Sequence, residues 1–524
     1  MNSGDRQIAR GASIVMGGLA LSSLIGLLTT MLVSRAFGTQ AELDAFYAAN
    51  RLPELLFMLM AGGALASAFV PTFTGFLTRN DRPGAWRLAS AVANLVALVL
   101  VAASLLAALG ARWLVTTILA PGFSDPAQVD LTVSLMRILL IAPAIFGLSG
   151  LVMGILNAHQ RFALPALAPA MYRMGWILGL WLLVPGMGIY GLAWGVVLGA
   201  LLHLAIQLPG LLRLGGRYLP SLGRGNPAVA EVGRLMLPRL LGVAVVQLNF
   251  VVNTILASGM PEGSLAALTF AFTLMIMPQA VIGQASAIAA LPTFSAQYAR
   301  GELDSLRGSL GNTLRAVFFL ALPASIGLAM LSTPIVAALF ERGAFTAHST
   351  EMVAWALIWF ALGLVGHSLL EVVSRAFYAL HDTRTPVLVG VVAMTLNLVL
   401  SLVLWRAFAA AGWMPHGALA LANSLATGVE CVVLLGLIRR RLGGLQGRRL
   451  RPGLMASTAS AAVLSLALAG WLLLTQGWLP VAVAAGGVIV GMGVYLGVAV
   501  VLGAPEPAAL WRAVARRVGR QRNV

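Results

Sequence analysis

VPTFTGFL at residues 70–77 and LPTFSAQY at residues 291–298 carry the same proline and aromatic pattern, in which Pro71 corresponds to Pro292. Pro165 in NAHQRFALP and Pro386 in YALHDTRTP form a second corresponding pair, and the interval between its members is identical to that of the first pair. Two independent landmarks with one spacing indicate an internal repeat. The chain is therefore predicted to contain two matching halves.

The composition is that of a polytopic membrane protein. Of 524 residues, 59% are hydrophobic and only 10% are charged, which is far more apolar side chain than a globular core could cover. Apolar runs follow one another along the whole sequence, and a helix needs about 20 such residues to cross a bilayer. The sequence therefore predicts an all-α membrane protein with about 14 transmembrane helices.

The repeat and the number of spans together predict three parts. Residues 1–219 and 220–444 are expected to form two lobes of six helices each, and residues 445–524 two further helices with a basic tail. Because six is an even number, both repeats enter the membrane from the same side and are parallel. Two parallel lobes that face each other are the plan of a transporter with a site between them.

The distribution of charge predicts the orientation. All 34 basic residues are arginines, and the formal net charge is +17. With a cytoplasmic amino terminus, twenty-three arginines fall on the cytoplasmic side and only four on the opposite side. This asymmetry follows the positive-inside rule and predicts that both termini are cytoplasmic. The arginines are spread over eight separate segments, which indicates topology and contact with anionic lipids rather than nucleic-acid binding.

Three charged residues stand where the second predicted span enters the bilayer. Asp44 and Arg51 are two helical turns apart and Glu54 follows Arg51 by three residues, so all three can share one side of a helix. A central arginine costs roughly 2.5–3.5 kcal/mol on an insertion scale, so it normally faces a polar interior or a partner. We favour a stripe that lines a hydrophilic cavity over a self-neutralising cluster at the membrane surface.

Two further arginines are predicted inside spans. Arg173 and Arg239 have no acidic residue within a helical turn, so tertiary contacts or a ligand must satisfy them. Gln247 follows Arg239 by eight residues and can share its face, and Asn253 adds another hydrogen-bonding group to the same span. These four residues are candidates for the cavity lining.

The second half of the chain offers one charged pair and one isolated acid. Glu371 and Arg375 are four residues apart and predict an intrahelical ion pair, which would serve either the structure or the cavity. Glu430 stands alone in the twelfth predicted span and is a candidate coupling site if it is protonated.

Catalytic and metal-binding motifs are lacking in the sequence. The six histidines are scattered without metal-ligand spacing, and Cys431 is the only cysteine, which excludes an internal disulfide. The sequence contains no phosphate-binding GxxxxGK[ST] motif, so direct ATP hydrolysis is not expected. We expect no enzymatic activity, no metal and no cofactor.

Several strings occur in a characteristic order through both halves. They are SRAFG at 34–38, DAF at 44–46, RLP at 51–53, AFVPTF at 68–73, APGF at 120–123, NAHQRFALPALAP at 157–169, NTILAS at 253–258, ERGAF at 341–345 and RAFYALHDTRTP at 375–386. In these strings the chain resembles the MurJ (MviN) family. Members of this family are lipid II flippases within the multidrug, oligosaccharidyl-lipid and polysaccharide exporter superfamily.

This resemblance implies two lobes around a V-shaped cavity, with a groove for a polyprenyl tail formed by the last two helices. It implies movement of the undecaprenyl-diphosphate-linked peptidoglycan precursor from the inner to the outer leaflet of the bacterial cytoplasmic (inner) membrane. The driving force would be the membrane potential or an ion gradient, and transport would proceed by alternating access. The expected partners are this lipid and membrane lipids, with cell-envelope synthesis enzymes as further candidates. Asp44 and Arg51 match charged family positions of the second helix.

The chain departs from the family pattern where arginines are expected to hold the diphosphate. In the first, second and eighth helices, uncharged residues stand at the positions that are usually charged. These residues are Ser23, Thr29, Thr30, Phe57, Met58, Phe272 and Thr273. We hypothesise that Arg173 and Arg239 supply the missing positive charge from other helices.

Three alternatives to lipid II transport stay open on the sequence alone. An exporter of cationic or amphipathic small molecules on the same scaffold would need acidic groups, which Asp44, Glu54, Glu371 and Glu430 can supply. A flippase for another polyprenyl-linked polysaccharide precursor would use the same arginines. A non-transporting scaffold for cell-envelope enzymes would need none of the cavity residues.

Overall fold

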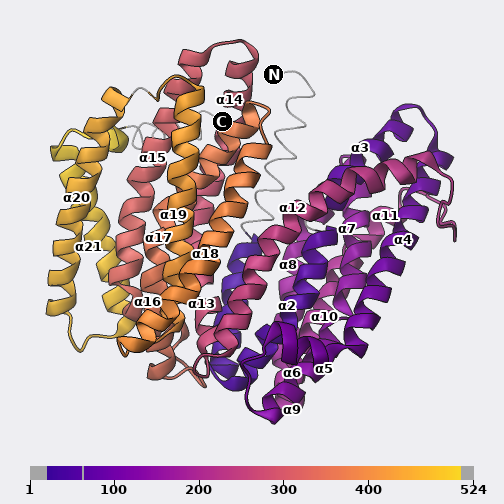
Figure 1. Cartoon of the computed structure of the whole chain (residues 1–524), viewed down its shortest axis with the longest axis horizontal. Helices are drawn as coiled ribbons and strands as arrows, with labels where there is room; N and C mark the ends of the chain where they lie inside the picture. Colours follow the sequence, from indigo (N-terminus) through magenta and orange to yellow (C-terminus); the bar gives the residue numbers. More distant parts are fainter. Residues whose placement is uncertain (1–20, 62–63, 446, 509–524) are drawn as a thin grey trace, which may run out of the picture. The chain divides into compact units, whose positions relative to one another are not determined.

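The computed structural model describes residues 21–61, 64–445 and 447–508, and every regular element in these ranges is a helix (Figure 1). Eleven helices of the described chain are long and apolar enough to cross a membrane, and each contains one of the span centres that the apolar runs predict near residues 97, 145, 174, 200, 280, 320, 364, 396, 427, 463 and 490. The three other predicted spans fall on the helix Leu21–Phe37, on α2 (Ala41–Ala61) and on α12 (Pro227–Ser258). The predicted fold class is confirmed, and a count of about 14 spans is consistent with these helices.

Helices in the two halves of the chain begin at matching positions. α3 (Ala64–Thr78) and α14 (Ala285–Ala299) are both 15 residues long, and their first residues are separated by the same interval as the landmark prolines. α4 (Arg82–Leu109) and α15 (Leu303–Met330) are both 28 residues long and have the same offset. The landmark prolines Pro71 and Pro292 therefore occupy equivalent places in their helices, as an internal repeat requires.

Contacts group the described chain into two compact units. Unit 1 contains the residues up to Ala266 together with the short segment Arg342–Phe345, and unit 2 contains Ala267–Glu341 and the residues from Thr346 onward. α12 thus belongs to unit 1 by its contacts. The lobe boundaries at 219/220 and 444/445 come from the sequence repeat and stay predictions.

Unit 1 appears in indigo to magenta in Figure 1. Within it, α2 packs against α6, α7 and α12, so residues of α2 face several neighbours at once. Its other elements are α5 (Ala111–Leu114), η1 (Val115–Leu119), α6 (Pro126–Leu139), α7 (Ala142–Ala158), α8 (Ala163–Leu178), η2 (Gly179–Leu183), α9 (Val184–Met187), α10 (Ile189–Ala205) and α11 (Leu208–Leu212).

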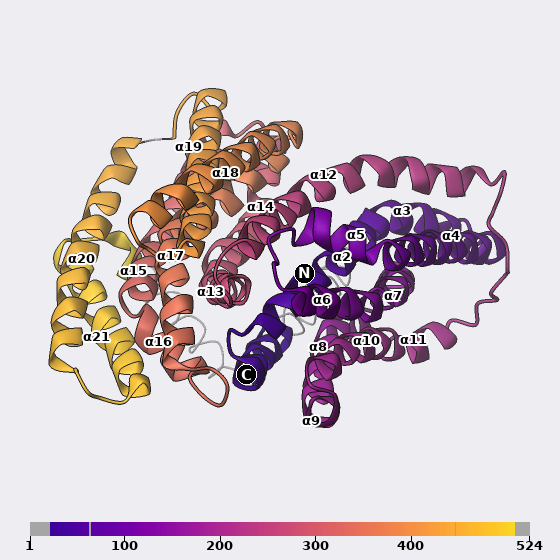
Figure 2. The same cartoon turned by 60° about the horizontal axis from the view of Figure 1, so that its bottom comes forward.

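Glycines bring α8 and α10 into close contact, and Figure 2 shows the two helices side by side. A Cβ atom built on Gly175 would lie 2.2 Å from the Cα atom of Gly199, which no real side chain tolerates. Small residues let helix backbones approach closely where lipid gives no hydrophobic drive for association. This contact fixes α8, and therefore Arg173, in unit 1.

Unit 2 is built around α17 (Ala347–Ala379), which packs against α14, α15, α16 and α19. The last two helices pack against each other and against α15, where the hydroxyl of Tyr495 donates a hydrogen bond to the carbonyl of Phe319 at 2.8 Å. The remaining elements are α13 (Ser264–Gln279), η3 (Ala280–Gln284), α16 (Ser332–Phe340), α18 (Arg384–Ala410), α19 (His416–Arg441), α20 (Gly447–Leu474) and α21 (Pro480–Val501).

Candidate functional site

A polar cluster in unit 1 centres on Arg51 of α2, whose side chain is 14% exposed. Its Nε donates a hydrogen bond to the hydroxyl of Thr254 in α12 at 3.0 Å, and its Nη1 lies 3.0 Å from a carboxylate oxygen of Glu54. The guanidinium also lies 5.7 Å from the ring centre of Phe250. A permanent charge is thus held by one carboxylate, one hydroxyl and one aromatic face.

Thr254 is oriented for this contact by its own helix. It is fully buried, and its hydroxyl donates to the carbonyl of Phe250 at 2.9 Å, which turns an oxygen lone pair toward Arg51. Phe250 and Thr254 are four residues apart in α12, so the ring and the hydroxyl lie on one face. One face of α12 therefore provides both a hydrogen-bond acceptor and an aromatic ring to the guanidinium.

Arg173 of α8 belongs to the same region of unit 1. Its guanidinium lies 5.7 Å from the ring centres of both Tyr172 and Trp176, and no carboxylate of the described chain lies within ion-pair distance. Tyr47 of α2 is close enough to interact electrostatically with Arg173 and also with Arg51. The structure therefore places both arginines near Tyr47.

Arg173 also lies beside the first described helix. A Cβ atom built on Gly26 would be 3.7 Å from Nε of Arg173. Gly26 lies three residues from Ser23 and Thr29 and four from Thr30, the positions that carry charged residues in the family pattern. The hydroxyls of Thr29 and Thr30 donate to carbonyls of their own helix instead, at 2.8 and 3.0 Å.

Asp44 has a different environment from Arg51. It is 3% exposed, and its two carboxylate oxygens each accept a backbone hydrogen bond of 2.7 Å, one from Gly263 and one from Ala266. Asp44 thereby caps the start of α13, while Glu262 accepts the N–H of Ala41 at the start of α2 at 2.7 Å. Asp44 therefore stabilises the positive amino-terminal end of α13, and Glu262 stabilises that of α2. A role for Asp44 in lining a cavity stays a prediction.

The SRAFG and ERGAF strings meet beside this junction in unit 1. The N–H of Ala344 donates to the carbonyl of Arg35 at 2.9 Å. Gly38 has a φ of +57°, and a Cβ atom on it would lie 2.4 Å from the carbonyl oxygen of Ala344. Both the backbone conformation and the close approach require glycine at this position.

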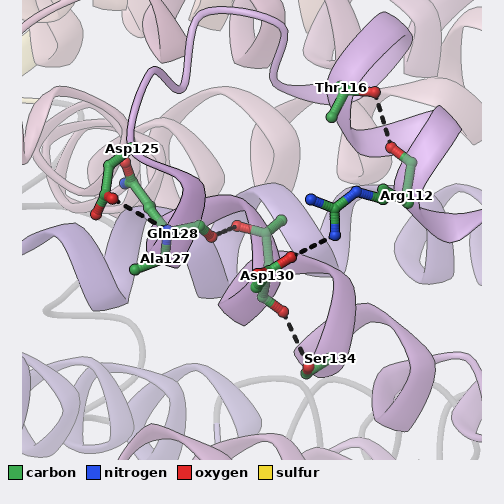
Figure 3. Close-up of polar contacts among 8 residues, drawn as sticks. Arg112, Thr116, Asp125, Ala127, Gln128, Asp130 and Ser134 are labelled. Atoms are coloured by element: carbon green, nitrogen blue, oxygen red, sulfur yellow. Dashed lines mark hydrogen bonds and ion pairs between the residues drawn. The ribbon is translucent and has the colours of Figure 1, made fainter.

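Figure 3 shows further polar contacts of unit 1, where α5 and η1 meet α6. Arg112 forms an ion pair with Asp130 at 2.5 Å, and both side chains are more than half exposed. Asp125 caps α6 through the N–H of Ala127, and Gln128 donates to the carbonyl of Ala41 at 3.2 Å. The exposed pair is a surface feature, whereas the Gln128 contact ties α6 to the beginning of α2.

The other predicted residues of α12 lie on the same helix as Thr254. Arg239 is helical, but its side chain lies outside the described part of the structure. Gln247 is half-buried, and Asn253 donates to Asn249 at 3.4 Å. The buried carbonyl oxygen of Asn253 accepts no hydrogen bond from the described residues.

Glu371 and Arg375 form the intrahelical ion pair that their spacing predicts, so this geometry is confirmed. Gln279 donates to the second carboxylate oxygen of Glu371 at 3.3 Å. Both charged side chains are 23% exposed and belong to unit 2, whereas Arg51 belongs to unit 1.

Spacing along α2 did not single out Thr254, Phe250, Tyr47 or Gln279 as contacts of the charged residues. Thr254 stands in the NTILAS string, and its four-residue spacing from Phe250 was the available signal. Among the residues described, no group of three or more histidine, cysteine, aspartate or glutamate side chains could hold a metal ion.

The arrangement of helices matches solved structures of transporters. A structure of lipid II flippase MurJ in an inward closed conformation aligns with a TM-score of 0.79 at 23% identity, covering 93% of this chain and 98% of that one. An inward-facing multidrug resistance MATE family transporter aligns with a TM-score of 0.68 at 18% identity, covering 83% and 99%. The class is therefore a polytopic helical membrane protein with the fold that these transporters share.

Sequence comparison identifies the family within this class. The model of the family described as lipid II flippase MurJ matches residues 33–488, and the chain belongs to this family. Lipid II flippase MurJ of Burkholderia cenocepacia is 34% identical over 385 residues, which is 72% of this chain and 74% of the relative. The probable lipid II flippase MurJ of Bdellovibrio bacteriovorus is 31% identical over 480 residues, 90% of each chain.

Proposed function

We propose that this protein moves lipid II, a polyprenyl-diphosphate-linked peptidoglycan precursor, from the inner to the outer leaflet of the bacterial inner membrane. The observation that carries the proposal is the mostly buried guanidinium of Arg51, fixed between Thr254 and Glu54 in a chain of this family. Both termini are expected on the cytoplasmic side because the arginines concentrate there.

The Arg51 cluster suits an anionic diphosphate. The contacts to Thr254 and Glu54 use Nε and Nη1, and no described residue accepts a hydrogen bond from Nη2. A guanidinium presents its donors as a planar fork that matches phosphate oxygens in pairs. Arg51 can therefore bind phosphate without giving up the contacts that orient it.

Arg173 would supply the second positive charge. Its guanidinium contacts two aromatic rings but forms no ion pair with a carboxylate of the described chain. Because Arg173 lies beside Gly26, its charge is next to the uncharged Thr29 and Thr30. This placement supports the hypothesis that positive charge has moved to α8 from the first helix. Arg239 would add a third charge from α12.

We infer that transport proceeds by alternating access without ATP hydrolysis, driven by the membrane potential or an ion gradient and without a cofactor. The protein would act as a transporter and not as an enzyme. Cell-envelope synthesis enzymes are the proposed protein partners.

The test is replacement of a host flippase. A bacterial strain whose own lipid II flippase is depleted should grow when this gene is expressed, and lipid II should become exposed on the outer leaflet. Growth without lipid II exposure would contradict the proposed substrate. Resistance to cationic compounds in place of rescue would support the exporter alternative, for which Glu54 offers a 39% exposed carboxylate.

A further inference from the structure

An open, basic pocket lies at the end of α19 in unit 2. Its volume is about 550 Å³, and it is lined by Gly436, Arg439, Arg440, Gly443 and Gly444. The two arginines are exposed, and the three glycines carry no side chain into the space. The pocket is open, so a headgroup at the protein surface can reach both arginines.

The arginines of the pocket are not neutralised by nearby acids. Asp382 pairs with Arg441, Asp304 accepts a hydrogen bond from Arg307 at 2.7 Å, and Glu302 pairs with Arg300, so these three acids are already engaged. Neither Arg439 nor Arg440 has an ion-pair partner in the described chain. The pocket therefore has a surplus of positive charge.

Arg307 of α15 lies beside these two arginines, although its own charge is balanced by Asp304. A Cβ atom built on Gly443 would lie 3.0 Å from Nη2 of Arg307, which places a third guanidinium at the edge of the pocket. Its Nε is buried and receives no hydrogen-bond partner from the described residues. The unpaired guanidinium groups of Arg439 and Arg440, with Arg307 beside them, attract an anion with several acceptor oxygens.

The side chains of Arg439 and Arg440 are not needed to cap the carboxyl end of α19. The N–H of Gly443 donates to the carbonyl of Arg440 at 3.2 Å, and the N–H of Gly444 donates to the carbonyl of Arg439 at 2.8 Å. The backbone turn thus satisfies the terminal carbonyls that arginine side chains often bind at helix ends. The side chains of both arginines are left for another partner.

An apolar stripe leads along α19 to this pocket. Val429, Val433, Gly436 and Arg440 follow one another at spacings of four, three and four residues, so they share one face. Val429 is 46% exposed and Val433 is 42% exposed. The same face therefore offers an apolar surface to an acyl chain and, at Gly436, the part of the basic pocket that we call the notch to a headgroup.

We propose that this pocket binds the phosphate of an anionic phospholipid, in the leaflet at which α19 ends, with an acyl chain along Val429 and Val433. The notch at Gly436 admits the phosphate, and Arg439 and Arg440 neutralise it. This lipid is a bound component of the protein and not its transported substrate. The stripe favours a lipid over a free phosphate because a soluble anion would gain nothing from the valines.

The binding experiment uses the full chain in detergent, titrated with phosphatidylglycerol and followed by native mass spectrometry. Each juxtamembrane arginine contributes about fivefold to binding of an anionic lipid, so the double variant Arg439→Gln/Arg440→Gln should bind about 25-fold more weakly. Gly436→Leu keeps both charges but fills the notch, and it should also weaken binding. Phosphatidylcholine should not occupy the site.

The matched control is Arg213→Gln/Arg217→Gln, which removes the same charge from two exposed arginines of unit 1. It should bind phosphatidylglycerol as the parent chain does. An equal loss in both double variants, or parental binding by Gly436→Leu, would overturn the proposal. Displacement of the lipid by inorganic phosphate would also overturn it, because the ligand would then be a free anion. If the double variant does not fold, Gly436→Leu decides the result.

Discussion

Nε of Arg51 in α2 lies 3.0 Å from the hydroxyl oxygen of Thr254 in α12, far along the chain. The contact joins the single arginine of α2 to a fully buried hydroxyl, and Glu54 balances the charge from the next helical turn. These two contacts fix the orientation of the guanidinium.

Arg51→Ala should abolish or strongly reduce lipid II exposure, while Arg51→Lys should retain part of it. Lysine keeps the positive charge but cannot reach Thr254, Glu54 and a phosphate as a planar fork. Thr254→Val should give an intermediate loss, since a hydrogen bond to a charged group contributes about 1.5–3 kcal/mol. Outer-leaflet lipid II in a strain depleted of its own flippase is the measurement.

Arg112→Ala is the control for these variants, because it removes an arginine from an exposed ion pair whose partner Asp130 is also exposed. It should leave transport unchanged. Full transport by Arg51→Ala would show that the embedded charge has no part in handling the substrate.

Arg173→Ala tests the idea that positive charge has moved to α8. Transport should fall because the variant removes a positive charge that could pair with a diphosphate, and the neighbouring rings of Tyr172 and Trp176 cannot replace that charge. Adding back an arginine through Thr30→Arg in the Arg173→Ala background should restore part of the activity, since the two positions flank Gly26. Arg239→Ala should reduce transport as well; parental activity in both single alanine variants would refute the relocation.

The spacing of residues along the chain predicted those features that depend on residues close together in sequence or on the order of the helices. The proline landmarks predicted the repeat, and four-residue spacing predicted the Glu371 and Arg375 pair. Both follow from the geometry of a single helix or from the order of helices along the chain. Apolar length likewise predicted the spans, because the thickness of the bilayer fixes it.

Contacts between distant segments were beyond this reasoning. Asp44 shares a helix face with Arg51 by spacing, yet its oxygens bind the N–H groups of Gly263 and Ala266, which belong to the other half of the sequence repeat. No sequence pattern indicated that α2 packs against the start of α13. Arg51 and Thr254 illustrate the same limit, since only packing of α2 against α12 brings them together.

Asp44→Asn should destabilise the protein by about 2 kcal/mol, because an amide offers one acceptor oxygen where the carboxylate accepts two charge-assisted hydrogen bonds. Thermal unfolding in detergent measures the change. Glu42→Gln is the control, since Glu42 is exposed in the same helical turn. Equal stability of the two variants would mean that the carboxylate does not hold the start of α13.

The loop between α17 and α18 should contribute acid-sensitive stability. Hydrogen bonds from the backbone and hydroxyl of Thr385, together with Arg441, lower the pKa of Asp382 below its ordinary value. An unfolded aspartate takes up its proton near pH 3.9, so the stabilisation is complete above about pH 5 and is lost as the pH falls through the folded pKa.

Asp382→Asn should therefore unfold more easily than the parent at pH 7, and the difference should shrink as the pH falls below 4. Thermal unfolding across this range measures it, and Asp130→Asn in an exposed pair is the control. A difference that stays constant down to acid pH would contradict the assignment to this carboxylate.

Gly38→Ala should be among the most damaging single methyl additions in unit 1. Its φ of +57° disfavours any residue with a Cβ, and the added carbon would lie 2.4 Å from the carbonyl oxygen of Ala344, so the SRAFG and ERGAF segments would have to separate. The left-handed conformation alone costs an alanine about 1–2 kcal/mol, and the collision adds to it.

Gly186→Ala is the matched control, because nothing lies within 4 Å of a Cβ at that position. Thermal unfolding should show a clear loss for Gly38→Ala and parental or slightly higher stability for Gly186→Ala. Parental stability of both variants would mean that the contact between Gly38 and Ala344 is not maintained in the membrane protein.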